Sequence, residues 1–115
     1  MKAQRGWATI IGIVLLLVGI VGFFMDSPLF GLAGTNTSHN LVHLVTGAIF
    51  LWAGLSRKAP AMAVNKWLGV IYILVAILGF LGLLAFLNVG GGMDFDNWLH
   101  LVIGVVSAGF GWFAR

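Results

Sequence analysis

Long apolar runs alternate with short polar segments along the chain, and this pattern predicts four membrane-spanning helices. Each run approaches the roughly 20 residues that a helix needs to cross the hydrocarbon core of a bilayer. The second and fourth runs are short and begin with polar residues, so we expect both to contact protein at that end. The predicted fold is therefore an all-α membrane protein, residues 1–115 forming one membrane domain. The four runs cover about residues 7–25, 39–55, 67–87 and 96–113.

A polar motif opens both the second and the fourth run. The pattern N-x-x-H-L-V-x-G begins at Asn40 and again at Asn97, 57 positions later. In each copy another glycine follows seven residues after the glycine that ends the pattern. Steps of three, four and seven residues return to one face of a helix, so each copy forms a single stripe. The stripes are Asn40, His43, Gly47 and Gly54 in the first copy, and Asn97, His100, Gly104 and Gly111 in the second.

The rest of the chain also aligns at this offset, which predicts an internal repeat of residues 1–58 and 59–115. Matching positions outside the motif include Gly12 with Gly69, Gly22 with Gly79, and Phe23 with Phe80. With two spans in each unit, both units enter the membrane in the same direction. We therefore expect two tandem helical hairpins related by a pseudo-two-fold axis along the membrane normal.

The charged residues predict how the chain is oriented. Only 8% of the residues are charged and 61% are hydrophobic, whereas about a quarter of a soluble domain is charged. All six basic residues lie near the two ends or in the middle loop, and all three acidic residues lie in the other two loops. The positive-inside rule then places both termini on the cytoplasmic side of a bacterial inner membrane. The net charge of +3 thus indicates topology and a lipid environment, and we expect no nucleic-acid partner.

We interpret the stripe first as a helix-packing motif. Glycines let neighbouring helices approach closely in lipid. Thr37 and Asp94 are the expected N-caps, which places each motif asparagine where its side chain can reach back as in a capping box. Each histidine is then expected to hydrogen-bond to asparagine or to a backbone carbonyl across the pseudo-axis, so that a paired Asn/His motif braces the helices near the outer leaflet.

His43 and His100 are also candidate cofactor-binding residues. His43 lies about six residues below the start of its predicted helix, or ~9 Å, at a depth where ionisable side chains are uncommon and often functional. Two imidazoles related by a two-fold axis are suited to be axial ligands of haem iron or of a chlorophyll-type pigment. Four short helices packed through glycine leave little room for a macrocycle, so we expect no cofactor. The sequence assigns no metal ligand, and we interpret His39 as a solvated loop residue.

A proton or small-solute pathway is a further alternative, with Asp94, Asp96 and His39 feeding it from the outer surface. Transporters bind their solutes near the bilayer midplane, where this chain offers only hydroxyl groups that we expect to bond to their own helices. These hydroxyls belong to Thr46, Tyr72 and Ser107. The sequence lacks a nucleophile elbow, a zinc-protease motif and a phosphate loop, so we expect no enzyme.

The chain resembles a bacterial family of small four-span membrane proteins of unknown function. The resemblance rests on the Gly22-Phe23 pair that ends the first run, the short outer loop after it, and N-x-x-H-x-x-x-G at the start of the second and fourth runs. It implies an architecture but no activity. Our leading hypothesis is a non-enzymatic structural or accessory protein, present as a homo-oligomer or within a larger membrane complex.

Overall fold

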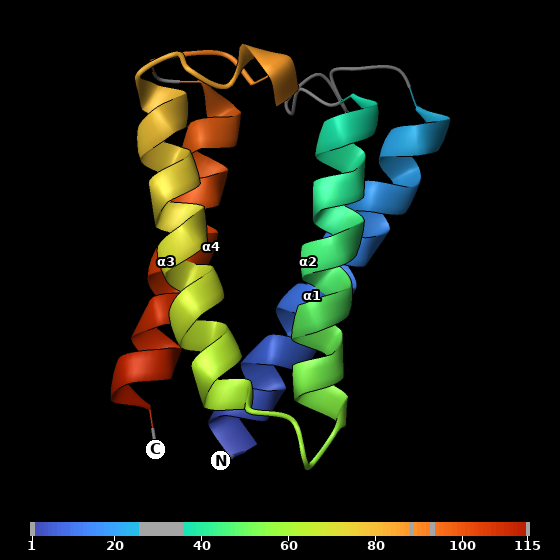
Figure 1. Cartoon of the computed structure of the whole chain (residues 1–115), viewed down its shortest axis with the longest axis vertical. Coiled ribbons are helices and arrows are strands. Elements are labelled where there is room, and N and C mark those ends of the chain that lie inside the picture. The colour runs from blue at the N-terminus through green and yellow to red at the C-terminus, as the bar shows by residue number, and fades with distance from the viewer. Residues whose placement is uncertain (1, 26–35, 88, 93, 115) are drawn as a thin grey trace.

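The computed structural model describes residues 2–25, 36–87, 89–92 and 94–114. Within these ranges the fold is all-helical, with four α-helices, one short 3-10 helix and no strand (Figure 1). Asp26 and Arg115, which entered the prediction of orientation, and most of the outer loop after the first run lie outside the described residues. The elements are α1 (Lys2–Phe24), α2 (Thr37–Leu55), α3 (Ala61–Phe80), η1 (Ala85–Leu87) and α4 (Phe95–Phe113).

The helices form two antiparallel hairpins that lie side by side. α1 packs against α2, and α3 packs against α4. Figure 1 shows the two ends of the chain and the α2–α3 connection at one end of the molecule, and the α3–α4 connection with η1 at the other. The whole measures 37 × 28 × 18 Å, so its long axis exceeds the ~30 Å thickness of a bilayer's hydrocarbon core.

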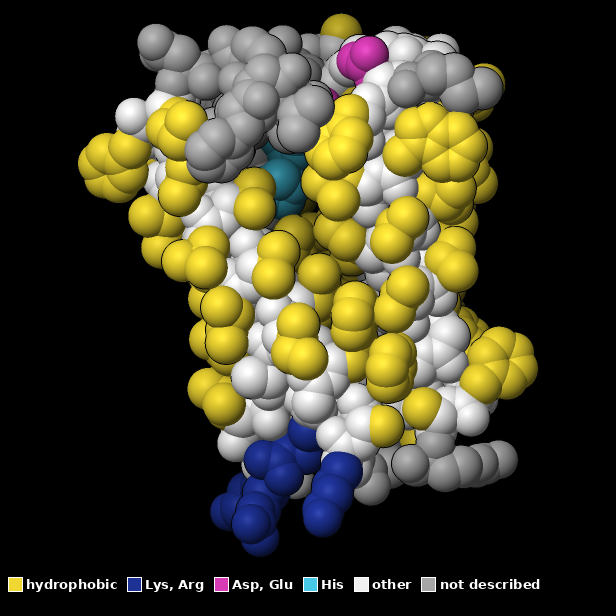
Figure 2. Space-filling model, turned by 180° about the vertical axis from the view of Figure 1, so that it is seen from behind, with side chains coloured by type: hydrophobic (Ala, Val, Ile, Leu, Met, Phe, Trp, Pro, Cys, Tyr) yellow, Lys and Arg dark blue, Asp and Glu magenta, His cyan; other side chains and the backbone are white. Residues whose placement is uncertain are grey.

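Charge is segregated between the two ends of the bundle (Figure 2). We call them the basic end, where α1 and α3 begin, and the acidic end, where α2 and α4 begin. The described basic side chains are Lys2, Arg5, Arg57, Lys58 and Lys66, and the described acidic ones are Asp94 and Asp96.

Glycines bring the helices of each hairpin into backbone contact. A Cβ atom added to Gly12 would lie 2.9 Å from the carbonyl oxygen of Gly47. In the second hairpin, a Cβ on Gly104 would lie 2.8 Å from the carbonyl oxygen of Gly69 and 2.6 Å from the backbone nitrogen of Ile73. These separations are shorter than real side chains tolerate, so only glycine permits this approach. The two contacts lie at positions that the 57-residue offset relates.

The outer glycines of the stripe act in the same way nearer the basic end. A Cβ on Gly54 would lie 2.5 Å from the backbone nitrogen of Thr9, and one on Gly111 would lie 2.5 Å from that of Lys66. Every glycine of the two motif stripes therefore lies against the other helix of its own hairpin.

α3 ends earlier than the apolar run predicts. The helix stops at Phe80, and Gly82 follows with φ of 76°. The N–H of Leu83 bonds to the carbonyl of Leu78 at 3.0 Å, and that of Gly82 bonds to Gly79 at 2.9 Å. This is the Schellman arrangement, in which a glycine in the left-handed region ends a helix. The prediction of a continuous span to residue 87 is wrong for the helix, because apolar residues continue past this stop.

The helix caps also differ from the prediction. The N-cap of α2 is Asn36, whose Oδ1 accepts the backbone N–H of His39 at 2.9 Å, so the assignment of Thr37 as the cap is wrong. Asp94 does occupy the N-cap position of α4, but its side chain makes no capping hydrogen bond. Because α2 starts at Thr37, His39 lies within its first turn.

α1 and α3 are long and apolar enough to cross a membrane, judged by length and composition. Only 28% of the most apolar stretch of each is buried within the molecule, whereas a core helix of a soluble protein is mostly covered. α2 and α4 fall short of the same criterion because polar and histidine residues occupy their first turns.

Candidate functional site

Three histidines meet at the acidic end, between the two hairpins. His39 and His43 come from α2, and His100 comes from α4. The ring centroids are 4.3 Å apart for His39 and His43, 5.6 Å for His39 and His100, and 6.2 Å for His43 and His100. The chain contains three histidines in all, so the fold collects every imidazole in one place, which we call the histidine cluster.

The histidine cluster is buried. His39 and His100 are each 2% exposed and His43 is 6% exposed, and Figure 2 shows histidine recessed between the hairpins. One ring nitrogen from each lies within 4.8 Å of those of the other two. Among the described residues, no hydrogen-bond partner reaches Nδ1 of His43 or of His100. The expected bonds from these nitrogens across the pseudo-axis are therefore not found in this part of the chain.

The interpretation of His39 as a solvated loop residue is wrong. His39 lies four residues before His43 on α2, a spacing that places both side chains on one helix face. Sequence reasoning missed it because the second copy has Asp96 at the equivalent position, which breaks the match. The sequence did contain a signal, because both motif copies have an ionisable residue at this position. His39 and Asp96 are both buried, with 2% and 3% of their surface exposed.

Asn97, the asparagine of the second motif copy, hydrogen-bonds to the connection before its helix. Nδ2 of Asn97 donates to the carbonyl oxygens of Gly90 at 2.9 Å and Gly92 at 3.0 Å, both in the α3–α4 connection. Its Oδ1 occupies the place that a Cβ atom on Gly79 would take. The amide thus joins the start of α4 to the end of α3 and to the loop between them.

The same contact occurs in the first hairpin. Oδ1 of Asn40 lies where a Cβ atom on Gly22 would be. The two glycines that precede the repeated phenylalanines, Gly22 and Gly79, are therefore needed to seat an amide. The predicted pairing of asparagine with histidine is not found for the amide nitrogen of Asn97, which bonds to loop carbonyls of its own hairpin. His43 and His100 face each other across the two hairpins.

A hydroxyl pair links the hairpins just below the histidine cluster. Oγ1 of Thr46 lies 2.8 Å from the carbonyl oxygen of Val42 and 2.7 Å from the hydroxyl of Tyr72. A threonine hydroxyl has one proton, so when it donates to Val42 the tyrosine donates to it. The Tyr72 ring centroid lies 5.8 Å from that of His100. This pair connects α3 to α2 and borders the cluster.

Two further polar links join the hairpins nearer the basic end. Nε1 of Trp7 donates to Oγ of Ser107 at 2.8 Å. Nδ2 of Asn65 donates to Oε1 of Gln4 at 2.9 Å, and Nε2 of Gln4 donates to the carbonyl of Ala114 at 3.0 Å. The expectation that the deep hydroxyls bond to their own helices is confirmed for Thr46, whereas the hydroxyls of Tyr72 and Ser107 bond to side chains of other helices. Polar contacts between the hairpins thus occur toward both ends of their interface.

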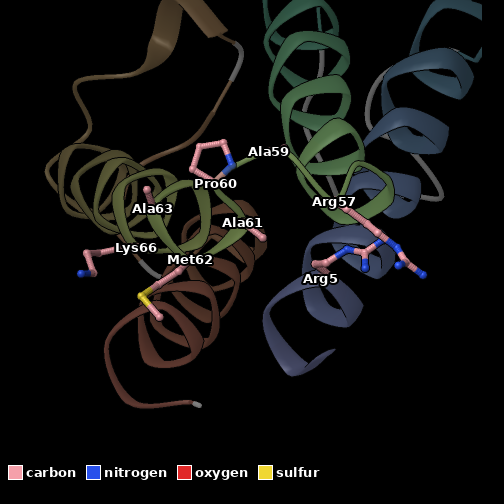
Figure 3. A pocket seen from close by; sticks show the side chains of 8 residues that line it. All are labelled: Arg5, Arg57, Ala59, Pro60, Ala61, Met62, Ala63 and Lys66. Atoms are coloured by element: carbon pink, nitrogen blue, oxygen red, sulfur yellow. The ribbon is translucent and has the colours of Figure 1, made fainter. Parts of the chain in front are cut away.

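A pocket of about 400 Å³ opens at the basic end (Figure 3). Two of the basic side chains that line it, Arg5 and Lys66, contact different partners. Nε of Arg5 donates to the carbonyl oxygen of Gly54 at 3.1 Å, and Nζ of Lys66 lies 5.1 Å from the ring centroid of Trp112. A cation near the last carbonyls of a helix is favourable, so Arg5 serves the end of α2. The pocket lining comprises Arg5, Arg57, Ala59, Pro60, Ala61, Met62, Ala63 and Lys66.

Comparison with known proteins gives a family but no activity. The family model of a domain of unknown function, DUF4383, matches residues 5–113. No curated protein matches the chain, and no solved structure matches it. The predicted resemblance to a family of unknown function is confirmed to that extent. With the match extending over almost the whole length of four helices and both motif copies, the chain belongs to the DUF4383 family.

Proposed function

We propose that this chain is a non-enzymatic integral membrane protein in which all four helices cross the bilayer. The observation that supports this is the way α2 and α4 distribute their residues. The histidines and asparagines in the first half of each helix, together with Asp96, are directed into the molecule, and apolar side chains of the same half face outward. The buried polar residues are His39, Asn40 and His43 on α2 and Asp96, Asn97 and His100 on α4, whereas Leu41, Val42, Val45, Trp98, Val102 and Val105 are exposed.

Lipid is the environment that suits such a surface. Soluble monomers rarely expose a contiguous apolar patch of more than a few hundred square ångströms, yet large apolar side chains are exposed on all four helices. Inside a bilayer, polar side chains hydrogen-bond between helices instead of facing the solvent. The polar residues near the start of α2 and α4 are thus compatible with crossing, because the histidines, the asparagines and Asp96 are buried within the molecule.

The segregated charges support an orientation with the basic end in the cytoplasm. Short loops rich in lysine and arginine stay on the cytoplasmic side of a membrane, and Arg57 and Lys58 lie in the connection between α2 and α3. Lys2 and Arg5 lie at the start of α1, which Figure 1 shows at the same end as this connection. The histidine cluster then lies near the outer leaflet of the inner membrane.

Labelling of single cysteines tests this topology directly, because the chain contains no cysteine. A membrane-impermeant maleimide is added to intact spheroplasts and to permeabilised ones. We expect Asp94→Cys to react in both, Lys58→Cys to react only after permeabilisation, and Val45→Cys, on the exposed face of α2, to react in neither. Equal labelling of Asp94→Cys and Lys58→Cys from outside, or ready labelling of Val45→Cys, contradicts four crossings.

A structural or accessory role fits how the motif residues are used. The glycines allow close contact between helices, and Asn97 bonds to the α3–α4 connection. We infer a subunit that self-associates or docks on a larger membrane complex. Cross-linking in native membranes, followed by mass measurement in mild detergent, is expected to give a homo-oligomer or a defined complex. A strict monomer without a partner in both measurements contradicts this role.

The geometry does not favour the two other functions considered for the histidines. A haem between His43 and His100 would need the space that the His39 ring takes, 4.3 Å from one and 5.6 Å from the other. A proton path along the interface would have to pass Trp7, whose indole N–H donates but cannot accept. Phe50 and Leu15, both buried in the same interface, add an apolar barrier.

A further inference from the structure

We propose that His39, His43 and His100 bind a single Zn²⁺ ion that joins the two hairpins at the acidic end. The site is formed only by the fold, since two of its ligands lie on α2 and the third lies on α4. It adds a binding activity to the membrane protein proposed above, and it does not depend on how that protein assembles.

The ligand set matches the chemistry of zinc. Imidazole nitrogen is a preferred ligand of Zn²⁺, and three histidines with one open position form a recurrent zinc site. Tetrahedral ligands at a Zn–N distance of about 2.0–2.1 Å lie roughly 3.4 Å apart. The candidate nitrogens of the cluster all lie within 4.8 Å of one another. Binding an ion therefore requires the separations between these nitrogens to shorten by at most about 1.4 Å.

The unsatisfied nitrogens support an ion at this place. Buried side-chain polar atoms are nearly always hydrogen-bonded, and each exception asks for an explanation, such as an ion. His43 and His100 are at least nine-tenths buried, yet Nδ1 of each has no hydrogen-bond partner among the described residues. A metal ion accepts nitrogen lone pairs that neighbouring side chains leave unused.

Asp96 is a buried carboxylate on the same helix as His100. It lies four residues before His100 on α4, which places both side chains on one face, and it is 3% exposed. Histidines that bind a metal commonly have a carboxylate nearby, either as a partner of the second ring nitrogen or as a further ligand.

A bound ion would link the two hairpins, because its ligands lie on α2 and α4. Inside the membrane the two hairpins are joined by the polar links described above, and coordination across α2 and α4 adds a strong one at the acidic end. Because the ion would bind the folded chain and not the unfolded one, the protein should melt at a higher temperature in its presence.

The experiment uses the full chain purified in detergent with an affinity tag that contains no histidine, since all native histidines are in the site. The protein is stripped with a chelator, loaded with ZnCl₂, separated from free ion by gel filtration and analysed for metal. We expect one Zn²⁺ per chain and a higher melting temperature. Zinc that is lost on gel filtration overturns the proposal.

Single variants locate the site. We expect His39→Gln, His43→Gln and His100→Gln each to weaken zinc binding by more than the roughly 10–100-fold that the loss of an outer-shell partner costs, and to abolish the shift in melting temperature. Asp94→Asn, an exposed acid at the same end, is the matched control and should bind as the parent does. Parental affinity in all three histidine variants overturns the proposal.

A spectroscopic measurement on the parent chain covers the case in which a variant does not fold. Cu²⁺ substituted into the stripped protein reports its nitrogen ligands through electron paramagnetic resonance. Coupling to imidazole nitrogens of three histidines supports the site, whereas a spectrum with no nitrogen coupling, or with one nitrogen, contradicts it. Circular dichroism and elution volume identify variants that have lost the fold.

Discussion

Single glycines decide how closely the helices of each hairpin approach, and the structure separates those that matter from those that do not. A Cβ on Gly104 would lie 2.6 Å from the backbone nitrogen of Ile73, whereas one on Gly109, on the same helix, meets nothing within 4 Å. Backbone atoms cannot rotate out of the way as side-chain ends can. The cost of a methyl group therefore depends on its position on α4.

We expect Gly104→Ala to destabilise the protein by about 1–3 kcal/mol, the usual cost of overpacking, and Gly109→Ala to change stability little. Thermal unfolding in detergent measures both. His43→Gln, which keeps a hydrogen-bonding side chain, should cost less than Gly47→Leu or Gly104→Leu when metal is absent. The reverse order would show that His43 contributes more to the packing of the bundle than the glycines do.

Asn97 occupies a position that needs a hydrogen-bond donor. Its Nδ2 donates two hydrogen bonds to loop carbonyls, and an aspartate at this position would turn two donors into an acceptor. We expect Asn97→Asp to cost about 1–3 kcal/mol, the penalty for buried polar groups left unsatisfied. Hydrogen exchange should increase in the α3–α4 connection. Equal increases in the first hairpin would contradict a local role.

Helices pair by two different means in this molecule. Within a hairpin, glycine allows backbone contact, as between Gly12 and Gly47. Between hairpins, side chains reach across and hydrogen-bond, as in the Tyr72–Thr46 and Trp7–Ser107 pairs. Without a hydrophobic driving force in lipid, close packing and interhelical hydrogen bonds are what remain to hold helices together. The two means are thus assigned to two different interfaces.

A double-mutant cycle measures the contribution of the link between hairpins. For Tyr72→Phe and Thr46→Val we expect a coupling energy of about 0.6 kcal/mol and at most ~1.7 kcal/mol, the range found for hydrogen bonds between membrane helices. Combining Tyr72→Phe with Ser107→Ala, which share no hydrogen bond, should give additive effects. Coupling as large in this second pair would show that the changes act through a general loosening of the bundle.

The whole molecule presents an apolar exterior and a polar seam inside, the opposite of a soluble bundle. Tryptophans lie both on the lateral surface and between the hairpins. Trp52 is 53% exposed, whereas the Trp7 ring stacks on Phe110 at a centroid distance of 5.4 Å and donates to Ser107. The lateral surface should therefore be in contact with acyl chains, and the seam should not.

Quenching by brominated lipids distinguishes the two surfaces. In vesicles, a variant that keeps only Trp52, with the other tryptophans changed to phenylalanine, should be quenched strongly. A variant that keeps only Trp7 should be quenched weakly, because its ring lies against α4. Strong quenching of Trp7 together with weak quenching of Trp52 would mean that the hairpins are arranged differently in the bilayer.

The sequence by itself determined the helices and the residues that pack within each hairpin. Apolar runs, polar starts and repeated glycines are local signals, and a hairpin with a short connection leaves its two helices little choice of partner. It did not determine the end of α3, because apolar residues continue after Gly82 and the hydrophobic pattern therefore does not indicate the turn there. The fold class and the positions of the glycine contacts thus follow from neighbouring residues along the chain.

Only the tertiary structure decided what the hairpins do to each other. Whether His39 meets His100, or Gln4 meets Asn65, depends on how one hairpin is rotated against the other, and no local pattern specifies that rotation. The offset relates His43 to His100, which do meet, but other pairs across the interface, such as Thr46 with Tyr72, are not equivalent positions. His39 joined the histidine cluster because α2 began early enough to bring it onto the inward face, which is a property of the assembled bundle.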